Sequence, residues 1–367
     1  MDGRGFVAAD FAQIYFTNPG EAPSDEEDTA LDDALIALID GAKRTIDIAI
    51  YELDDAHIID ALIRAHQRGV SVRMVGDADE ASDEGYLELV DHGIGQQLRY
   101  TSGIMHNKFA VVDQRVVWTG STNLTFNGLN RNNNNAILLN SEKLSVEFTA
   151  EFEQMYGNED YGAAKEDANS SNEVPFNDGA LEFYFAPQHE PVEVMEDLID
   201  EADHSALFMV FSFTHPNLSD ALIHAKERGV DVAGILDESQ SKPWYSKDEV
   251  LAEANVPVFL DGNKNASGWS GGKLHHKVLI VDAGTDSNPF VVTGSFNWSK
   301  NADTRNDENL IVLRDPAIVD QYFEEYCRLL EIAQPHPSYS GPGSKACLLS
   351  EVDVERSVSG TGDNPEL

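Results

Sequence analysis

Short apolar runs and amphipathic segments alternate in the same order in two separate stretches of the chain. Residues 46–51 and 207–213 are short runs of apolar and aromatic residues, which is typical of buried strands. An amphipathic segment that predicts a helix precedes each run, at residues 28–40 and 192–202. Further strands are predicted at residues 14–16, 70–75, 183–185 and 230–236. Strand, helix, strand, helix, strand in each half predicts an α/β fold built around mainly parallel sheets.

A ten-residue segment at the end of the second predicted helix occurs twice. Residues 61–70 read ALIRAHQRGV and residues 221–230 read ALIHAKERGV, which agree at seven of ten positions. Gly69 and Gly229 are expected to be the C-terminal glycines of these helices. We therefore expect an internal duplication, with a first repeat at residues 1–157 and a second repeat at residues 180–333.

Two polar segments lie outside the predicted repeats. Residues 158–179 are rich in Asn, Ser, Asp and Glu, and we expect a linker there. Residues 334–367 are rich in Pro, Gly and Ser and show no sustained periodicity, which is typical of a flexible C-terminal tail.

Charge limits the partners that the chain can attract. Asp and Glu number 65 against 25 Lys and Arg, for a formal net charge of -40. This excess does not favour long-range attraction to nucleic acid, and the sequence has no run of basic residues. We therefore expect a phosphate group to bind only in a local basic pocket. High salt would screen these charges, and an acidic surplus suits such conditions.

Cysteines, apolar stretches and the N-terminus say little about the compartment. Cys327 and Cys347 fit no zinc motif, and we interpret them as two thiols, with a disulfide that holds the tail as the alternative. No apolar stretch approaches the ~20 residues that span a bilayer. Residues 1–11 have no apolar segment like that of a secretory signal peptide, so the localisation stays open.

Each repeat carries the same polar motif after its third predicted strand. The first copy consists of His106, Asn107, Lys108, Asp113 and the turn Gly120-Ser121-Thr122-Asn123. The second copy consists of His275, His276, Lys277, Asp282 and the turn Gly294-Ser295-Phe296-Asn297. The spacing from His to Lys to Asp is identical in both copies, which makes a chance recurrence improbable.

Strand geometry places the His and the Lys of each motif on one side. Residues two apart on a strand project from the same face, so these two side chains point together and the residue between them points away. The Ser and Asn of each glycine turn should reach the same place from the adjacent strand, whereas we interpret Asp113 and Asp282 as structural. Two such faces around a pseudo-twofold axis would form one phosphate-binding pocket from His106, Lys108, Ser121, Asn123, His275, Lys277, Ser295 and Asn297.

Both motifs resemble the signature of the phospholipase D superfamily, which is His-x-Lys, four residues, Asp, and then Gly-Ser-x-Asn. The resemblance covers roughly residues 12–330. It implies a phosphodiesterase with two phospholipase D-like α-β-α sandwich domains and one shared active site. It also implies that no metal or other cofactor is needed. Because both motifs are in one chain, we expect a monomer.

The resemblance further implies a two-step displacement at phosphorus. A neutral histidine attacks to form a phosphohistidine, while the other histidine, protonated, gives its proton to the leaving alcohol. The charge on the non-bridging oxygens would be neutralised by Lys108, Lys277, Asn123 and Asn297.

Glu308 and Asn134 stand at equivalent places, eleven residues after the Asn of each glycine turn. The family usually has a carboxylate there, bonded to the histidine of its own motif. We therefore expect Glu308 to hold His275 and to make it the general acid, because a carboxylate favours imidazolium. His106, near Asn134, would then be the neutral nucleophile. The alternative is that Asn134 is simply part of a polar loop.

The motifs do not separate the phospholipases of the superfamily from its metal-independent nucleases. A zwitterionic phospholipid repels an acidic protein less than DNA does, so charge favours hydrolysis of phospholipid to phosphatidate and free head group. An endonuclease acting on DNA or RNA is the alternative. A lipid synthase is disfavoured because the sequence has no membrane anchor. A catalytically retired phosphate-binding module is a third hypothesis, against which stands the presence of all eight pocket residues.

Overall fold

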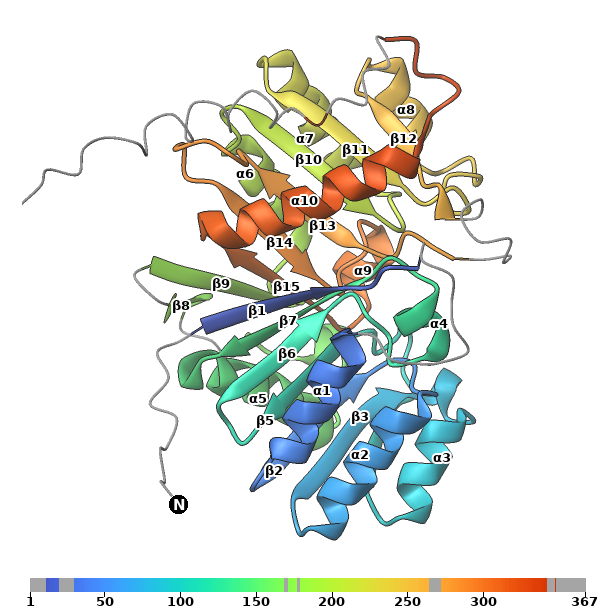
Figure 1. Ribbon diagram of the computed structural model, residues 1–367, viewed down its shortest axis with the longest axis vertical. Helices are drawn as coiled ribbons and strands as arrows, with labels where there is room; N and C mark the ends of the chain where they lie inside the picture. Colours follow the sequence, from blue (N-terminus) through green and yellow to red (C-terminus); the bar gives the residue numbers. More distant parts are fainter. Residues whose placement is uncertain are drawn as a thin grey trace, which may run out of the picture.

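The computed structural model describes residues 11–19, 30–167, 171–176, 179–263, 272–341 and 347, which form two α/β halves (Figure 1). The first half contains β1 (Phe11–Phe16), α1 (Ala30–Gly41), β2 (Thr45–Ile50), α2 (Ala56–Gln67), β3 (Ser71–Asp77), α3 (Glu84–Asp91), β4 (Gly95–Arg99), β5 (Lys108–Val112), β6 (Val116–Gly120), α4 (Phe126–Asn130), β7 (Asn135–Asn140) and α5 (Glu142–Tyr156). The second half contains β8 (Glu173–Phe176), β9 (Gly179–Ala186), α6 (Pro191–Asp200), β10 (Ser205–Val210), α7 (Pro216–Glu227), β11 (Asp231–Leu236), α8 (Asp248–Glu253), β12 (Val258–Leu260), β13 (Lys277–Val281), β14 (Phe290–Gly294), α9 (Lys300–Thr304), β15 (Glu308–Leu313), α10 (Pro316–Ile332) and β16 (Gln334–Pro335). The predicted order of strands and helices is therefore found in both halves.

Both sheets are mixed, so the prediction of mainly parallel sheets was wrong. The strand order is β1-β7-β6-β5-β2-β3-β4 in the first half and β16-β12-β11-β10-β13-β14-β15-β9-β8 in the second. Strands β2, β3 and β4 are parallel, as are β10, β11 and β12, because helices connect them. The strands that carry the polar motifs, β5 with β6 and β13 with β14, are antiparallel. Short connections, residues 113–115 and 282–289, join these pairs, and connections of this length can only link antiparallel strands.

The duplicated ten-residue segment ends helices α2 and α7, as predicted. The carboxylate of Asp55 caps α2 by accepting the N–H of Ile58 at 2.9 Å, whereas α7 starts with Pro216, whose fixed φ suits a first turn. Gly69 and Gly229 follow the two helices with φ of 90° and 98°, a conformation that strains any side chain larger than hydrogen. Each helix therefore stops just before the strand that it packs against.

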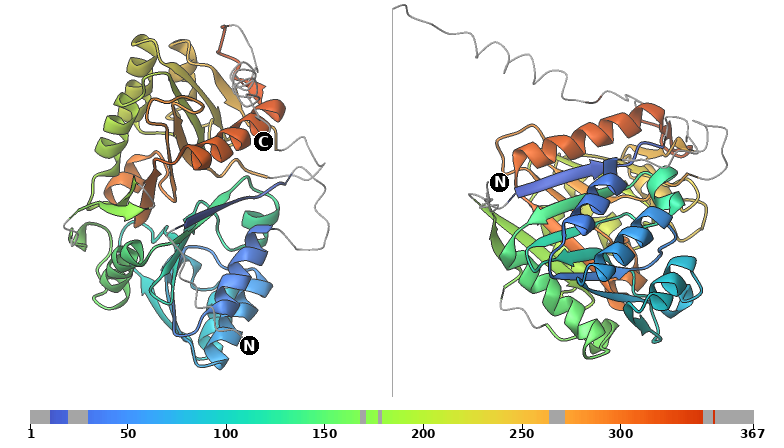
Figure 2. Two further views of the ribbon diagram at one scale, coloured as in Figure 1. Left: turned by 60° about the vertical axis from the view of Figure 1, so that its left-hand side comes forward. Right: turned by 60° about the horizontal axis from the view of Figure 1, so that its bottom comes forward.

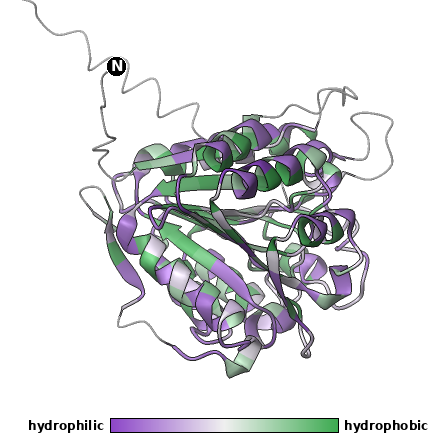
Figure 3. Cartoon of the chain, turned by 90° about the horizontal axis from the view of Figure 1, so that it is seen from below, coloured by the Kyte–Doolittle hydropathy of each residue, from purple (hydrophilic) through white to green (hydrophobic). Residues whose placement is uncertain are grey.

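The described residues form three hydrophobic cores, and one of these cores belongs to both halves. Helices α1 and α2 cover the outer face of the first sheet, and α6 and α7 cover that of the second. Between the stacked halves, α5 and α10 pack with the inner faces of both sheets (Figure 2). Phe148 of α5 lies 5.0 Å from Phe185 of β9 between ring centroids, and Phe16 of β1 lies 5.1 Å from Tyr322 of α10. Hydrophobic strands fill the interior while the helices turn hydrophilic faces outward (Figure 3).

The segments expected to be a linker and a tail are partly built into the fold. In the first, Lys165 is buried and β8 pairs with β9. In the second, β16 pairs with β12, and His336 is buried with Nε2 at 2.9 Å from the carboxylate of Asp248. Residues 342–346 and 348–367, on which the rest of the tail prediction falls, lie outside the described residues.

A disulfide joins Cys327 of α10 to Cys347, so the prediction of two thiols was wrong and its alternative is correct. Cys347 is packed beside α10 although it is separated from the rest of the described chain. In the part of the chain that the structure describes, no helix is long and apolar enough to cross a membrane.

Candidate active site

His106 and His275 reach one cavity from the two halves. Each stands two residues before the lysine that opens β5 or β13. Both histidines are 6% exposed, and both line a cavity of about 480 Å³. The backbone N–H of His106 donates to the carbonyl of Asp307 at 3.0 Å, and that of His275 donates to the carbonyl of Asn133 at 2.9 Å. Each motif is thus tied to the opposite half, which brings the two imidazoles together as the motifs predict.

The side chains that hold the two imidazoles are exchanged between the halves. Nδ1 of His106 lies 2.8 Å from Oε2 of Glu308, which follows the second motif. Nδ1 of His275 lies 2.9 Å from Oδ1 of Asn134, which follows the first motif. The expectation that each residue serves the histidine of its own motif was therefore wrong. The glycine turn of the first half ends beside the opposite histidine, since the carbonyl of Ser121 also lies 3.1 Å from Nδ1 of His275.

These contacts set the tautomer of both rings. The Glu308 carboxylate and the Asn134 and Ser121 oxygens are acceptors, so each Nδ1 must carry the hydrogen. The Asn134 amide is oriented by its Nδ2, which donates to the carbonyl of Gly128 at 2.8 Å. Nε2 of each ring therefore has a lone pair, and it receives no hydrogen bond from any described residue.

Burial lowers the pKa of both histidines. It lowers the pKa of His106 to about 4, although the neighbouring Glu308 carboxylate opposes the shift. Burial, followed by the positive charges of Lys277 and Lys108, holds the pKa of His275 well below its usual value. Both imidazoles are therefore neutral at pH 7 before a substrate binds.

Lys108 and Lys277 lie beside their histidines and are also buried. The ammonium of each donates to the carbonyl of the histidine two residues before it, at 2.7 Å in both copies. Burial lowers the pKa of Lys108 to about 8 and holds that of Lys277 well below its usual value. The two lysines thus lie close enough that their charges oppose one another, and an anionic ligand between them would favour protonation of both.

Ser121 and Ser295 orient other groups and do not donate into the cavity. Oγ of Ser121 donates to Oδ1 of Asn134 at 2.8 Å, and Oγ of Ser295 donates to Oε2 of Glu308 at 2.7 Å. Both hydroxyl hydrogens are therefore used and both serines are fully buried, and the expectation that the serines bind substrate stays a prediction. Asn134, also fully buried, contacts Nδ1 of His275 through its Oδ1.

Asn123 and Asn297 each have a buried amide oxygen without a partner. Asn123 is 8% exposed, lines the cavity and donates from Nδ2 to the carboxylate of Glu52. Oδ1 of Asn123 and Oδ1 of Asn297 accept no hydrogen bond from the described residues. A buried polar atom without a partner is rare in a folded protein, so a ligand is expected to complete it.

Both halves of the chain match a known protein family. The family profile described as "Cardiolipin synthase, PLD-like domain" matches residues 35–156 and 195–330, which is more than half of the chain. The protein belongs to the phospholipase D superfamily. The prediction made from the two motifs is thereby confirmed.

Individual relatives match only part of this superfamily member. A protein named "Phospholipase D" from Rickettsia bellii (strain RML369-C) is 34% identical over 142 residues, which are 39% of this chain and 65% of that protein. A "Mitochondrial cardiolipin hydrolase" from Drosophila melanogaster is 31% identical over 144 residues, which cover 33% of this chain and 57% of that protein. The crystal structure of phosphatidylserine synthase from Haemophilus influenzae Rd KW20 covers 95% of this chain and 94% of its own, with a TM-score of 0.67 and 15% identity. That likeness shows a shared fold across both halves.

The signature aspartates of the phospholipase D motif are structural in this chain, as predicted. Asp113 accepts the backbone N–H groups of Lys43, Arg44 and Thr45 at 2.6–3.0 Å. Asp282, fully buried, accepts those of residues 203–205 at 2.7–3.0 Å. Each aspartate therefore anchors the start of a neighbouring strand, at the end of the motif strand remote from the histidine.

Two aromatic rings beside the phospholipase D motifs were missed by the sequence analysis as site residues. The ring centroid of Tyr51 lies 5.3 Å from that of His106 and 5.5 Å from Nζ of Lys108. The ring centroid of Phe211 lies 4.7 Å from that of His275 and 5.0 Å from Nζ of Lys277. The two aromatics occupy equivalent positions of the duplication, 160 residues apart, and this equivalence is the signal that could have identified them.

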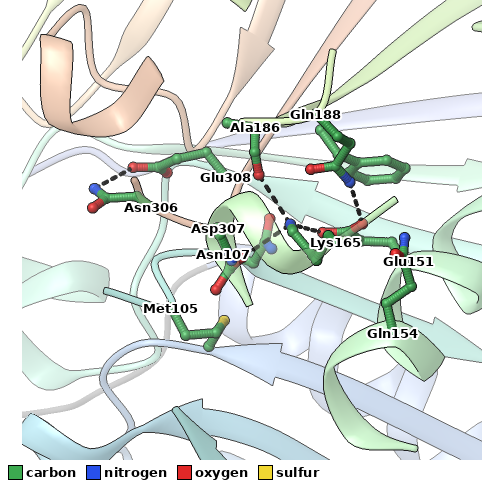
Figure 4. A network of polar contacts seen from close by, with 12 residues as sticks. Met105, Asn107, Glu151, Gln154, Lys165, Ala186, Gln188, Asn306, Asp307 and Glu308 are labelled. Carbon is green, nitrogen blue, oxygen red and sulfur yellow. Dashed lines mark hydrogen bonds and ion pairs between the residues drawn. The ribbon is translucent and has the colours of Figure 1, made fainter. Parts of the chain in front are cut away.

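A buried cluster of ion pairs supports the His106 side of the site (Figure 4). Asp307, whose carbonyl holds the His106 backbone, pairs with Arg99 at 2.7 Å and with Lys165 at 2.9 Å. Lys165 also pairs with Glu151 of α5. Arg99 and Asp307 are 208 residues apart, so no local pattern could have indicated the contact. Among the residues that the structure describes, no three His, Cys, Asp or Glu side chains are placed to hold a metal ion.

The residues between the His and the Lys of each motif point away from the cavity, as predicted, into a polar seam. Oδ1 of Asn107 accepts from Nδ2 of Asn309 at 2.9 Å. Nδ2 of Asn135 donates to Nδ1 of His276 at 2.9 Å, and Nε2 of His276 lies 3.2 Å from the carboxylate of Glu325. This seam fixes the two motif strands relative to one another.

Proposed function

We propose that the protein is a metal-independent phosphodiesterase that hydrolyses phospholipids to phosphatidate and a free head group through a phosphohistidine. The observation that carries this proposal is the pair of free Nε2 atoms, one from each half, at a single cavity. Relatives named phospholipase D and cardiolipin hydrolase support a lipid substrate. The net charge of -40 also favours a zwitterionic lipid over a nucleic acid.

Two displacements at phosphorus would complete the reaction. In the first, Nε2 of His106 forms a bond to phosphorus while the bond from phosphorus to the head-group oxygen breaks. His275, protonated on Nε2, gives that proton to the leaving oxygen. In the second, His275 takes a proton from water, the water oxygen attacks phosphorus, and the bond from phosphorus to His106 breaks. Both histidines return to their starting states.

The nucleophile is assigned to His106 because Glu308 holds it. Attack through Nε2 makes the ring a cation, and a fully buried carboxylate 2.8 Å from Nδ1 stabilises that cation. Asn134 offers His275 only an amide dipole. The phosphodiester anion, once bound, adds negative charge beside His275 and favours its protonation. The roles are those expected from the sequence, but the reason differs because the partners are exchanged.

Lys108 and Lys277 would neutralise the non-bridging oxygens. An ammonium has three N–H bonds, and each lysine uses one of them on a histidine carbonyl. The second N–H of the Asn123 amide and the amide of Asn297 would add donors. Losing one donor of this kind typically costs about 3 kcal/mol of transition-state stabilisation.

The experiment that tests the proposal compares substrates in the presence of a chelator. The protein is incubated with vesicles of phosphatidylethanolamine or phosphatidylcholine and, separately, with single- and double-stranded DNA. We expect release of the amine head group and no release of nucleotides. His106→Ala and His275→Ala should each abolish the release, whereas His224→Ala, at an exposed position of α7, should not.

Three outcomes would contradict the proposal. Turnover that survives loss of either motif histidine would exclude a shared site. A requirement for a divalent ion would exclude the mechanism. Nucleotide release without head-group release would favour the endonuclease.

A further inference from the structure

The cavity beside the two histidines lies over loops of the first half. Asn123 lines it, whereas Asn297, the counterpart of Asn123 in the second half, is not part of the lining. The main contribution from the second half, apart from His275, comes from Phe211 and Lys273. The histidine pair is nearly symmetric, but the space around it is not, so the two ester groups of a bound phosphodiester meet different surroundings.

Among the residues that the structure describes, four carboxylates line this cavity, and all come from the first half. Glu52 and Asp54 follow β2, and Glu80 and Asp83 follow β3. Glu52, Glu80 and Asp83 are half-buried, and the four carboxylates outnumber the two basic side chains, Arg131 and Lys273, that line the same cavity. Burial raises the pKa of Asp83, and the charges of Glu52 and Asp54 raise it further. These carboxylates therefore repel one another and would be stabilised by a cation.

The second half has no such charges at the equivalent positions. The repeat offset of 160 residues aligns Glu52 with Ser212, Asp54 with Thr214, Glu80 with Gln240 and Asp83 with Pro243. An acidic surface spread over the whole molecule would not by itself produce this difference between two copies of one fold. The negative charge thus belongs to one side of the active site.

The unpaired amide oxygen of Asn123 also favours a cationic ligand. Its Nδ2 donates to the carboxylate of Glu52, and its Oδ1 accepts no hydrogen bond from the described residues. A phosphodiester anion has no hydrogen to donate to this buried acceptor, whereas a primary ammonium has three. In the second half, Oδ1 of Asn297 also has no partner among the described residues. The residue equivalent to Glu52 there is Ser212, so no carboxylate stands at that position.

An organic cation fits these carboxylates better than a metal ion does. Metal ligands must converge at short distances around one point, and across the described part of the chain no three carboxylates or histidines do so. The Tyr51 ring, which also lines the cavity, adds an aromatic face that attracts ammonium groups.

We propose that the side of the cavity lined by Glu52, Asp54, Glu80, Asp83 and Asn123 is a subsite for the primary ammonium of a phospholipid head group, with the free oxygen of Asn123 accepting an N–H and the four carboxylates attracting the charge across the cavity. This inference rests on the proposed function. The turn that carries Asn123 also carries Ser121, whose carbonyl accepts from Nδ1 of His275, the proposed general acid. The leaving oxygen would receive its proton from His275, which lines the same cavity as Asn123. The ammonium of the same head group would therefore lie in this cavity too. Phosphatidylethanolamine, which can donate to Asn123, is preferred over phosphatidylcholine, which cannot, and phosphatidylglycerol has no cation at all.

The test measures kcat/KM for the three lipids in mixed micelles. We expect the order phosphatidylethanolamine, phosphatidylcholine, phosphatidylglycerol. Glu80→Gln combined with Asp83→Asn keeps the side-chain shapes and removes two charges. This double variant should lower the ratio of ethanolamine to glycerol lipid on the order of tenfold.

A matched control separates the subsite from the net charge. Glu84→Gln combined with Asp91→Asn makes the same change of charge on the neighbouring helix α3, outside the cavity lining. Its substrate ratio should equal that of the unmodified protein. An unchanged ratio in the Glu80/Asp83 variant, or an equal fall in the control, would overturn the inference.

A binding measurement keeps the inference testable if no lipid is hydrolysed. Calorimetric titration compares phosphoethanolamine with glycerol 3-phosphate, using the unmodified protein and both double variants. Tighter binding of phosphoethanolamine that is lost only in the Glu80/Asp83 variant would support the subsite while the proposed function fails. Equal affinity of both compounds for the unmodified protein would refute the subsite itself.

Discussion

His106 and His275 occupy equivalent positions of the duplication but differ in the charge of the group that holds Nδ1. Glu308 is a carboxylate and Asn134 is a neutral amide, and both are fully buried. The backbone symmetry delivers two similar rings to one cavity, and this single difference in charge makes them unequal. One ring can then be stabilised as a cation after attack, while the other exchanges a proton with the leaving group and with water.

The location of the phosphoryl group tests this inequality. With a p-nitrophenyl phosphodiester, whose leaving group needs no proton, His275→Ala should still form the phosphohistidine but hydrolyse it slowly. Mass spectrometry at alkaline pH should then locate the phosphoryl group on His106. His106→Ala should accumulate none. A phosphoryl group found on His275 in the unmodified protein would reverse the assignment.

The lowered lysine and histidine pKa values predict the pH dependence of kcat/KM. Burial lowers the pKa of Lys108 to about 8, so this lysine loses its proton as the pH rises through 8 and no longer offsets the phosphate charge. Loss of this charge should add a further decline above pH 8 to the one that begins at lower pH, because burial and neighbouring positive charges hold the pKa values of the general acid His275 and of Lys277 well below their usual values. On the acidic side His106 stays neutral down to about pH 4, so activity should persist to nearly that pH. Lys108→Arg, whose guanidinium stays charged, should move the alkaline decline upward; an unmoved decline would exclude Lys108 as its cause.

The turns after β6 and β14 decide where the histidine partners lie. Gly120 and Gly294 have φ of 148° and 140°, and a Cβ on either would lie 2.3 Å from the carbonyl of Asn135 or Asn309. Only glycine lets the turn approach the next strand so closely. The turn then positions Ser121 or Ser295 to orient the side chain that holds the opposite histidine.

The anchoring role of Asp282 at the far end of β13 predicts a loss of stability without a loss of chemistry. Asp282→Ala removes the acceptor of three backbone N–H groups and should lower the free energy of unfolding by about 3 kcal/mol. Urea denaturation measures this change. Asp286→Ala, at an exposed position of the same hairpin, is the matched control and should have little effect. A fall in kcat per folded molecule comparable to that of His275→Ala would instead make Asp282 part of the chemistry.

At the scale of the whole molecule, the two halves share a core and a site. Helices α5 and α10 bury residues from both sheets in one cluster. Lys165, from the segment between the halves, pairs with Glu151 of the first half and Asp307 of the second. Opening this interface would expose apolar surface and unpaired buried charges together, which is costly.

The shared core predicts that the two halves unfold together. Calorimetry should show one transition, with calorimetric and van't Hoff enthalpies that agree. Phe148→Ala, which removes a fully buried ring that contacts Phe185 of the other half, should lower the stability by about 3–5 kcal/mol and leave the transition single. Two resolved transitions would show that the halves are independent.

The sequence by itself determined the duplication, the order of strands and helices within each half, and the side chains that carry the chemistry. These features depend on neighbours a few residues away. The two-residue period of a strand places His106 with Lys108 and turns Asn107 away, and a glycine after the duplicated segment ends each helix. The repeat also made a shared pocket the simplest arrangement.

Only the tertiary structure decided which group holds which histidine, because those contacts join residues 202 and 141 positions apart. The packing of the two halves also placed Lys165 in a buried ion-pair cluster with Asp307 of the second half. The tertiary structure also decided that the hairpins of β5 with β6 and β13 with β14 join the parallel strands in one sheet. The apolar runs in the sequence do not show in which direction neighbouring strands run. Local sequence patterns specify which side chains lie on the same face of a strand. The packing of the two halves decides which residues of the other half those side chains contact.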